Sequence, residues 1–239
     1  MRHQHAGGSS RGAVLLLHGI AMLPAFNAFL ARDLRRAGFA PVLNWGYPPR
    51  MDSIEAVAER VARRLRRRFP SGLPALHGVG HSMGGLVLRR LWADGVLPPS
   101  GRLVTLGTPH QGAVKADRHA GRWYFRLVFA GAGQDLRPGS DFLRRLPPQP
   151  PVTVLSVVAG TGTARGLCDA VAGDNDGVVE VGSARLPGSR ELFVTGVRHG
   201  VLPLHPQVRC AVVAFLLGRD AELPARLDAR AVSAAAHRP

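Results

Sequence analysis

The chain has 239 residues, of which 46% are hydrophobic, and it carries a formal net charge of +15. A chain of this length can bury a large core, so we expect one large globular domain and exclude disorder throughout. Its two cysteines, Cys168 and Cys210, are too few for a disulfide framework or a metal knuckle. No apolar run approaches the roughly 20 residues of a membrane-spanning helix.

Nearly all of the positive charge is arginine, because Lys115 is the only lysine. Such a positive charge can bind a nucleic acid or an acidic membrane surface. The arginines are scattered, however, and form neither a basic stripe nor a known nucleic-acid module, so a compositional bias explains them better. We therefore predict no nucleic-acid partner, and we leave transient contact with membrane lipid and the oligomeric state open.

The N-terminal segment 1–12 is polar and rich in Gly and Ser, which predicts a flexible leader. Arg2 and Arg11 flank an apolar stretch in the manner of a short secretion signal. His18 and Gly19 interrupt that stretch, and no small-residue cleavage site follows it. Together with the sparse cysteines, which suit a reducing compartment, this pattern favours a cytoplasmic protein.

From Ala13 the chain alternates short apolar runs with amphipathic stretches, which predicts a mostly parallel sheet with helices on both faces. The apolar runs predict strands over residues 13–18, 39–44, 75–80, 102–106, 151–159 and 190–195. The amphipathic stretches predict helices over residues 24–37, from a cap pair at Asp52 and Glu55 to Arg68, over 83–93 and over 207–217. Cys210, in the last helix, is expected in the core.

Two segments stand outside this alternation. Residues 113–150 contain an aromatic cluster that either packs as an ordinary helix or forms a cap that lines and gates a pocket. The cluster comprises Trp123, Tyr124, Phe125 and Phe129. Residues 219–239 are rich in alanine and weakly patterned, so we expect a C-terminal tail after a domain that spans residues 13–218.

The pentapeptide GHSMG at residues 80–84 matches G-x-S-x-G, in which a serine lies on a sharp turn between a strand and a helix. Small flanking residues let the two backbones approach each other closely. A predicted strand precedes this pentapeptide and a predicted helix follows it, as the motif requires. We therefore expect Ser82 to be a nucleophile.

A serine hydroxyl needs a base to take its proton and N–H donors to hold the oxyanion. The backbone N–H of Met83, at the start of a helix, would be one donor, and that of Ile20, after the first strand, would be the other. His18 is expected to support this loop by hydrogen bonding rather than to act as the base. His81 is expected to point into the structure, and His77 to lie on the surface.

The acid and the base should follow the serine in chain order, each at the end of a strand. The stretch GDNDGVV at residues 173–179 offers two acids. Asp176 is preferred as the residue that orients the base, whereas Asp174 is expected to be a loop cap or a calcium ligand. His199 follows the sixth strand and is the expected base. Its rival, His205, is expected to be structural. No histidine pair has zinc-ligand spacing, so no metal is predicted.

With these residues in place, the chain resembles bacterial lipases and esterases of the α/β-hydrolase superfamily. The matching pieces are LLLHG at 15–19, GHSMGG at 80–85, TLGTPHQG at 105–112, NDGVV at 175–179 and a histidine before the last helix. The resemblance implies an α/β-hydrolase fold in a compact version that lacks the first strands. It gives the triad roles to Ser82, Asp176 and His199, and the oxyanion hole to Ile20 and Met83.

The resemblance also implies a serine hydrolase that cleaves carboxylic esters through an acyl-enzyme intermediate, without a cofactor. Its substrate would be a small-molecule or lipid ester. A large lid and a clear secretion signal are not evident, which favours a small esterase over a triacylglycerol lipase. Two alternatives stay open, namely an acyltransferase with the same triad and a catalytically silent α/β-hydrolase fold that acts as a binding protein.

Overall fold

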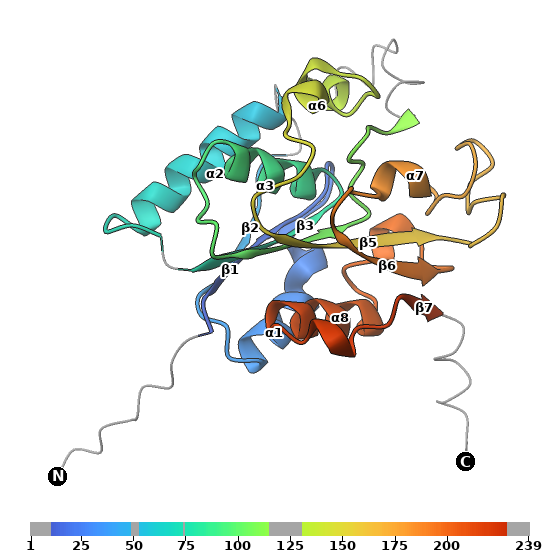
Figure 1. Ribbon diagram of the computed structural model, residues 1–239. Helices are drawn as coiled ribbons and strands as arrows, with labels where there is room; N and C mark the ends of the chain where they lie inside the picture. The colour runs from blue at the N-terminus through green and yellow to red at the C-terminus, as the bar shows by residue number, and fades with distance from the viewer. Residues whose placement is uncertain (1–10, 49–52, 74, 115–130, 229–239) are drawn as a thin grey trace, which may run out of the picture.

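A computed structural model describes residues 11–48, 53–73, 75–114 and 131–228 (Figure 1). Seven strands form one parallel sheet in the order β2-β1-β3-β4-β5-β6-β7. The strands are β1 (Ala13–Leu17), β2 (Val42–Trp45), β3 (Leu76–His81), β4 (Arg102–Leu106), β5 (Thr153–Gly160), β6 (Arg190–Thr195) and β7 (Arg226–Asp228). Six of them lie where the sequence predicts strands.

Helices cover both faces of the sheet (Figure 1). On one face lie α1 (Ala28–Arg36) and α8 (Pro206–Leu216). On the other lie α2 (Ile54–Arg68), α3 (Met83–Ala93) and α6 (Asp141–Arg145). The shorter elements are α7 (Val181–Ala184) and the 3-10 turns η1 (Pro24–Asn27), η2 (His199–Val201) and η3 (Asp220–Glu222).

The buried strand β1 divides the core into two layers. Its five residues are all buried, as expected for a strand that is covered on both faces. Leu15 and Leu17 belong to the layer beneath α2 and α3, whereas Val14 and Leu16 belong to the layer beneath α1 and α8. Because successive side chains of a strand point to opposite faces, one continuous apolar run serves both layers.

The structure corrects three local expectations. Helix α2 begins after Ser53, whose hydroxyl accepts the N–H of Ala56 at 3.0 Å, so Ser53 is its cap. Asp52, which was expected in the cap pair, lies outside the described residues. Cys210 lies on the exposed side of α8. His77 is buried within β3, where its Nδ1 accepts the N–H of Arg102 at 3.2 Å.

Part of the expected C-terminal tail belongs to the sheet. β7 pairs with β6, and the register places Leu227 beside Val194. The strand is only three residues long and mostly exposed, which explains why no hydrophobic pattern predicted it. The aromatic cluster at residues 123–129 and the leader residues 1–10 lie outside the described part of the chain.

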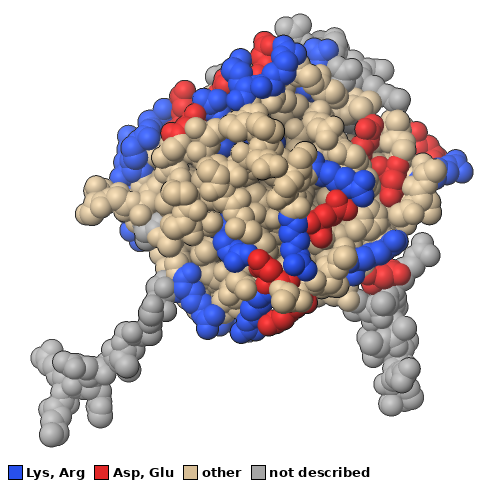
Figure 2. All heavy atoms as spheres, viewed as in Figure 1, with Lys and Arg blue, Asp and Glu red and all other residues tan. Residues whose placement is uncertain are grey.

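Arginine side chains are spread over the visible face of the molecule, and a row of them follows α2 (Figure 2). Six arginines of α2 are exposed to solvent: Arg60, Arg63, Arg64, Arg66, Arg67 and Arg68. Acidic side chains lie among them, and Glu59 pairs with Arg63 at 3.6 Å. None of the helices in the described residues has the length and the apolar character that crossing a membrane would require.

Candidate active site

Ser82 occupies a sharp turn between β3 and α3. Its backbone has φ 53° and ψ −125°, a left-handed conformation that side chains rarely adopt. The turn depends on its glycines, because a Cβ on Gly80 would lie 2.3 Å from the backbone nitrogen of Gly85. A Cβ on Gly84 would lie 2.5 Å from the carbonyl oxygen of Leu17. The close packing of these backbones therefore forces the serine into its strained position.

The loops after β1 and β4 lie on either side of Ser82. The N–H of Ser82 donates to the carbonyl of Leu106, the last residue of β4, at 2.9 Å. A Cβ on Gly19, in the loop after β1, would lie 2.9 Å from the Cβ of Ser82. β2 and β3 lie on opposite sides of β1, so the serine follows the point where the strand order reverses. Open α/β sheets bind their ligands beside the carboxyl ends of strands at such a point.

Asp176 and His199 form a buried pair. The Nδ1 of His199 donates to Oδ2 of Asp176 at 2.6 Å, and the carboxylate is 1% exposed. The other oxygen, Oδ1, accepts the N–H groups of Val178 at 3.0 Å and Val179 at 2.8 Å. The N–H of His199 also donates to the carbonyl of Asp176 at 2.9 Å. These bonds fix the carboxylate and leave Nε2 of His199 as the nitrogen that can accept a proton.

Two contacts bring this pair next to Ser82. A Cβ on Gly107 would lie 3.1 Å from both Oδ2 of Asp176 and Nδ1 of His199, and Gly107 directly follows the residue that accepts the serine N–H. The ring of His81 lies 4.8 Å from that of His199, and its Nε2 donates to the carbonyl of His199 at 3.0 Å. The segments that contain the serine, the acid and the histidine thus meet at the carboxyl edge of the sheet.

The two expected oxyanion donors belong to the loop after β1, which contains Ile20, and to the first residue of α3, which is Met83. Within the described residues, no main-chain carbonyl accepts the N–H of Ile20 or that of Met83. Met83 opens α3, where the first N–H groups of a helix have no partner within the helix. His18 bonds to this loop as predicted, because its Nδ1 donates to the carbonyl of Gly19 at 2.8 Å. An oxyanion donor requires an N–H group that is not already bound to a carbonyl, which fits both groups within the part of the chain that the structure describes.

The rival residues have structural surroundings. Asp174 accepts the N–H groups of Thr161 at 2.7 Å and Gly162 at 2.9 Å, and so caps the loop after β5. His205 is the residue that precedes the first turn of α8. The described part of the chain contains no group of three or more His, Cys, Asp or Glu side chains that could hold a metal ion.

A buried polar network supports the segment after β4. Arg89 of α3 donates to Nδ1 of His110 at 3.2 Å, and Nε2 of His110 donates to the hydroxyl of Thr105 at 3.2 Å. Burial lowers the pKa of Arg89 to about 10, so its guanidinium stays charged at neutral pH. Burial also lowers the pKa of His110 well below its ordinary 6.5, and the neighbouring Arg89 adds to this shift. The network holds the GTPHQG segment against the helix that follows Ser82.

Sequence reasoning missed Arg89 and Tyr47. Arg89 is buried in α3, and no local pattern in the sequence distinguishes it from the exposed arginines of the neighbouring helix. Tyr47 lies just after β2, and its hydroxyl bonds to the carbonyl of His18 in the loop after β1. Neighbouring parallel strands end at the same edge of a sheet, so a tyrosine directly after the second strand could have been suspected there.

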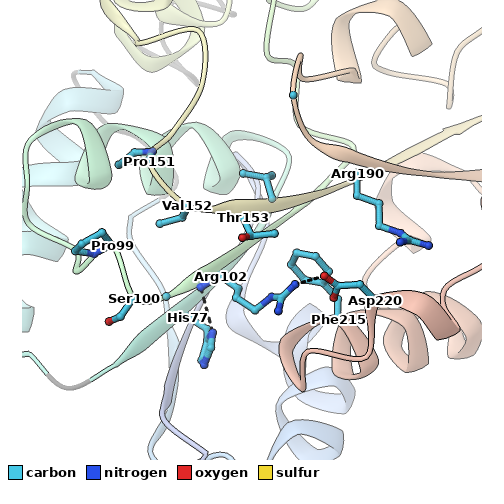
Figure 3. Close-up of a pocket in the computed structure, with 13 residues that line it drawn as sticks. His77, Pro99, Ser100, Arg102, Pro151, Val152, Thr153, Arg190, Phe215 and Asp220 are labelled. Atoms are coloured by element: carbon cyan, nitrogen blue, oxygen red, sulfur yellow. Dashed lines mark hydrogen bonds and ion pairs between the residues drawn. The ribbon is translucent and has the colours of Figure 1, made fainter.

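A cavity of about 660 Å³ lies at the opposite edge of the sheet, where β4, β5 and β6 begin (Figure 3). Arg102 crosses this cavity, pairs with Asp220 and stacks over the ring of Phe215 at 4.3 Å. None of the expected site residues lines it. The cavity is therefore separate from the candidate active site.

Comparisons with known proteins reveal similarity at the level of the fold. No protein-family profile and no curated protein sequence matches the chain. The mature lipase BlEst2 of Bacillus licheniformis superposes with a TM-score of 0.62 at 17% identity, over 93% of this chain and 96% of that one. The monoacylglycerol lipase of Paleococcus ferrophilus gives 0.62 at 14% identity, over 88% and 96%. Phospholipase PlaB of Legionella pneumophila gives 0.66 at 14% identity, over 85% of this chain and 58% of PlaB.

These similarities define the fold of the chain. The chain has the α/β-hydrolase fold of lipases and esterases, here built on seven parallel strands. Identities this low establish the fold alone, so the activity has to be argued from the site.

Proposed function

We propose that this protein is a serine hydrolase that cleaves carboxylic esters through an acyl-enzyme intermediate. The observation that carries the proposal is the buried pair of Asp176 and His199, joined at 2.6 Å, beside a serine in a strained turn. A buried carboxylate that orients an imidazole is what a serine needs to lose its proton at neutral pH.

In the proposed mechanism, Nε2 of His199 takes the hydroxyl proton of Ser82 as Oγ attacks the ester carbonyl carbon. Asp176 keeps the proton of the imidazole on Nδ1 and stabilises the imidazolium. His199 then protonates the departing alcohol, which leaves an acyl group on Ser82. Water then attacks the acyl carbonyl carbon while His199 takes its proton. His199 gives this proton to Oγ of Ser82 as the carboxylic acid leaves.

The oxyanion of each tetrahedral intermediate would be held by the N–H groups of Ile20 and Met83. Neither group has a main-chain acceptor among the described residues, and both follow strands that end beside the serine. Because such donors are already oriented, they stabilise the developing charge without any cost of reorganisation.

A small-molecule or lipid ester with an apolar part fits the surroundings of the site. An exposed apolar side chain comes two or three residues after each of three candidate site residues. These are Leu23 after Ile20, Val178 after Asp176 and Val201 after His199. Exposed apolar groups that gather around a site favour an apolar ligand. The lipases and the phospholipase with similar folds point to the same class of ester.

The decisive test is Ser82→Ala, assayed on short nitrophenyl esters and with a fluorophosphonate probe that labels activated serines. We expect hydrolysis to fall by about a thousandfold or more and labelling to vanish, with the melting temperature showing a folded protein. Ser189→Ala is the matched control. The hydroxyl of Ser189 donates to the carbonyl of Leu186 at 2.7 Å, far from the site. The Ser189→Ala variant should therefore keep the wild-type activity.

The same assay separates the alternatives. A wild-type protein that neither hydrolyses esters nor reacts with the probe would be a silent binding protein, and the proposal would be wrong. Labelling at Ser82 without release of free acid, but with transfer to an added alcohol, would instead identify an acyltransferase.

A further inference from the structure

The loop that contains Ile20 is held by the segment that follows β2. The side-chain amide of Asn44, in β2, donates to the carbonyl of Pro24 at 2.9 Å. Two residues later the segments touch, since a Cβ on Gly46 would lie 2.7 Å from Cγ of Pro24. The position of the loop after β1 is therefore set from outside, by its neighbour in the sheet.

Tyr47 makes three contacts with His18. Its hydroxyl donates to the carbonyl oxygen of His18, and its backbone N–H donates to Nε2 of the imidazole at 3.4 Å. The two rings are stacked, with centroids 4.2 Å apart and planes 29° apart. Burial raises the pKa of Tyr47, so its hydroxyl keeps its proton and can donate throughout the assay range.

These contacts, together with the bond from His18 to Gly19, fix one tautomer of the His18 imidazole. Nδ1 lies 2.8 Å from the carbonyl oxygen of Gly19, so it must carry the proton and donate. Nε2 is then unprotonated and can accept the N–H of Tyr47. Burial lowers the pKa of His18 below 6.5, which keeps the ring neutral at neutral pH.

The carbonyl of Gly19 belongs to the same peptide group as the N–H of Ile20. A peptide group is planar and trans, so its C=O and its N–H point in opposite directions. The imidazole that holds the carbonyl of Gly19 therefore also aims the N–H of Ile20. The hydroxyl of Tyr47 fixes the preceding peptide group through the carbonyl of His18.

We propose that Tyr47 is a positioning residue for the oxyanion hole, which orients the N–H of Ile20 through the ring and the carbonyl of His18. This inference rests on the proposed function. It follows from three contacts between Tyr47 and His18, from the bond between His18 and Gly19, and from the 2.9 Å approach of a Gly19 Cβ to Ser82. Oxyanion donors act through their preorganised direction, so a loosened peptide group costs transition-state stabilisation.

The test is Tyr47→Phe, which keeps the ring and removes only the hydroxyl. We expect kcat for a nitrophenyl ester to fall roughly 10- to 100-fold while KM changes little, because the oxyanion exists only in the transition state and the tetrahedral intermediate. The affinity for an alkyl boronic acid, which forms a tetrahedral adduct with an activated serine, should fall by a similar factor. Ser189→Ala, which also removes one hydroxyl bond to a carbonyl, should leave all three quantities unchanged.

A second measurement needs no variant. Nitrogen NMR of the imidazole groups in the wild-type protein should show His18 with its proton on Nδ1. A proton on Nε2, or a mixture of both forms, would overturn the inference even if Tyr47→Phe failed to fold.

The outcomes separate the two proposals. A folded Tyr47→Phe protein with kcat and boronic acid affinity within twofold of wild type would overturn the role of Tyr47 while Ser82 labelling still supported the hydrolase. A wild-type protein without turnover and without labelling would end both. A rise in KM with unchanged kcat would assign Tyr47 to substrate binding and contradict the inference.

Discussion

At the scale of single residues, the hydrogen bonds of Asp176 decide which ring nitrogen of His199 carries the proton. Oδ1 accepts two backbone N–H groups, from Val178 and Val179, and only Oδ2 faces the imidazole. The carboxylate is therefore bound in one orientation, and its roles are divided between its two oxygens.

That division predicts the effect of Asp176→Asn. The amide oxygen must take the place of Oδ1, since a backbone N–H needs an acceptor, and the amide NH₂ then faces Nδ1 of His199. A donor at this position selects the imidazole with its proton on Nε2, which cannot take a proton from Ser82. We expect kcat to fall by about a thousandfold or more.

The measurement is kcat on a nitrophenyl ester, with the melting temperature and the rate of fluorophosphonate labelling alongside. Labelling should slow together with turnover, because both require the same deprotonated serine. Turnover within tenfold of wild type in a folded variant would contradict the role given to Asp176.

At the scale of secondary-structure elements, α2 shows how one side chain sets the start of a helix. The hydroxyl of Ser53 accepts the N–H of Ala56 at 3.0 Å, and the apolar face that follows, from Ile54 to Leu65, is buried. The carboxylate of Asp135 accepts the N–H of Ile54 at 2.7 Å. Two of the N–H groups at this end of the helix therefore have side-chain acceptors.

For Ser53→Ala we expect a loss of about 1 kcal/mol in the free energy of unfolding, the usual effect of removing a helix cap. Catalytic constants should not change, because Ser53 contacts none of the candidate site residues. Urea titration followed by circular dichroism would measure the effect. Ser53→Asp should restore most of the stability, since aspartate also caps helices. An unchanged free energy of unfolding for Ser53→Ala, or an equal loss for Ser53→Asp, would contradict the role of Ser53 as a cap.

At the scale of the whole molecule, five histidines with a lowered pKa link the fold to pH. Burial is the largest cause of the lowered pKa at each of them, and the effect is strongest at His81 and His110. The others are His18, His77 and His205. In the folded protein these rings stay neutral at pH values where an unfolded chain would protonate them.

The sign of the effect follows from proton uptake. The unfolded chain binds protons near pH 6.5 and the folded chain binds them only at lower pH, so acid favours unfolding. The contribution of these neutral histidines to the free energy of unfolding is fully present above about pH 6.5 and is lost as the pH falls toward their pKa in the folded protein. For His81 and His110 the slope should be on the order of 1 kcal/mol per pH unit each.

Urea titrations between about pH 7.5 and about pH 5 would test this prediction. His110→Gln, which can keep an amide near Arg89 and Thr105, should show a shallower slope than wild type. A free energy of unfolding that stays constant over this range would contradict it.

Much of the molecule could be predicted from the sequence because the determining signals are local. The apolar runs of β1 and β3 must be buried on both faces, and a glycine-rich turn directly after β3 has one geometry that suits a serine. Six strands, the main helices and the grouping of Ser82, Asp176 and His199 as site candidates follow from such patterns. β7 escaped prediction because a short, exposed edge strand is fixed by its partner rather than by its own side chains.

The sequence alone determined the parallel sheet, the position of the sharp turn at Ser82 and the chain order of the candidate acid and histidine, because each depends on residues that are close along the chain. Only the tertiary structure decided which carboxylate faces the imidazole, what aims the N–H of Ile20 and where the helix caps lie. Those features depend on hydrogen bonds between segments far apart in the sequence, such as Asp176 with His199 and Tyr47 with His18. Their partners become known only when the sheet brings the strand ends together.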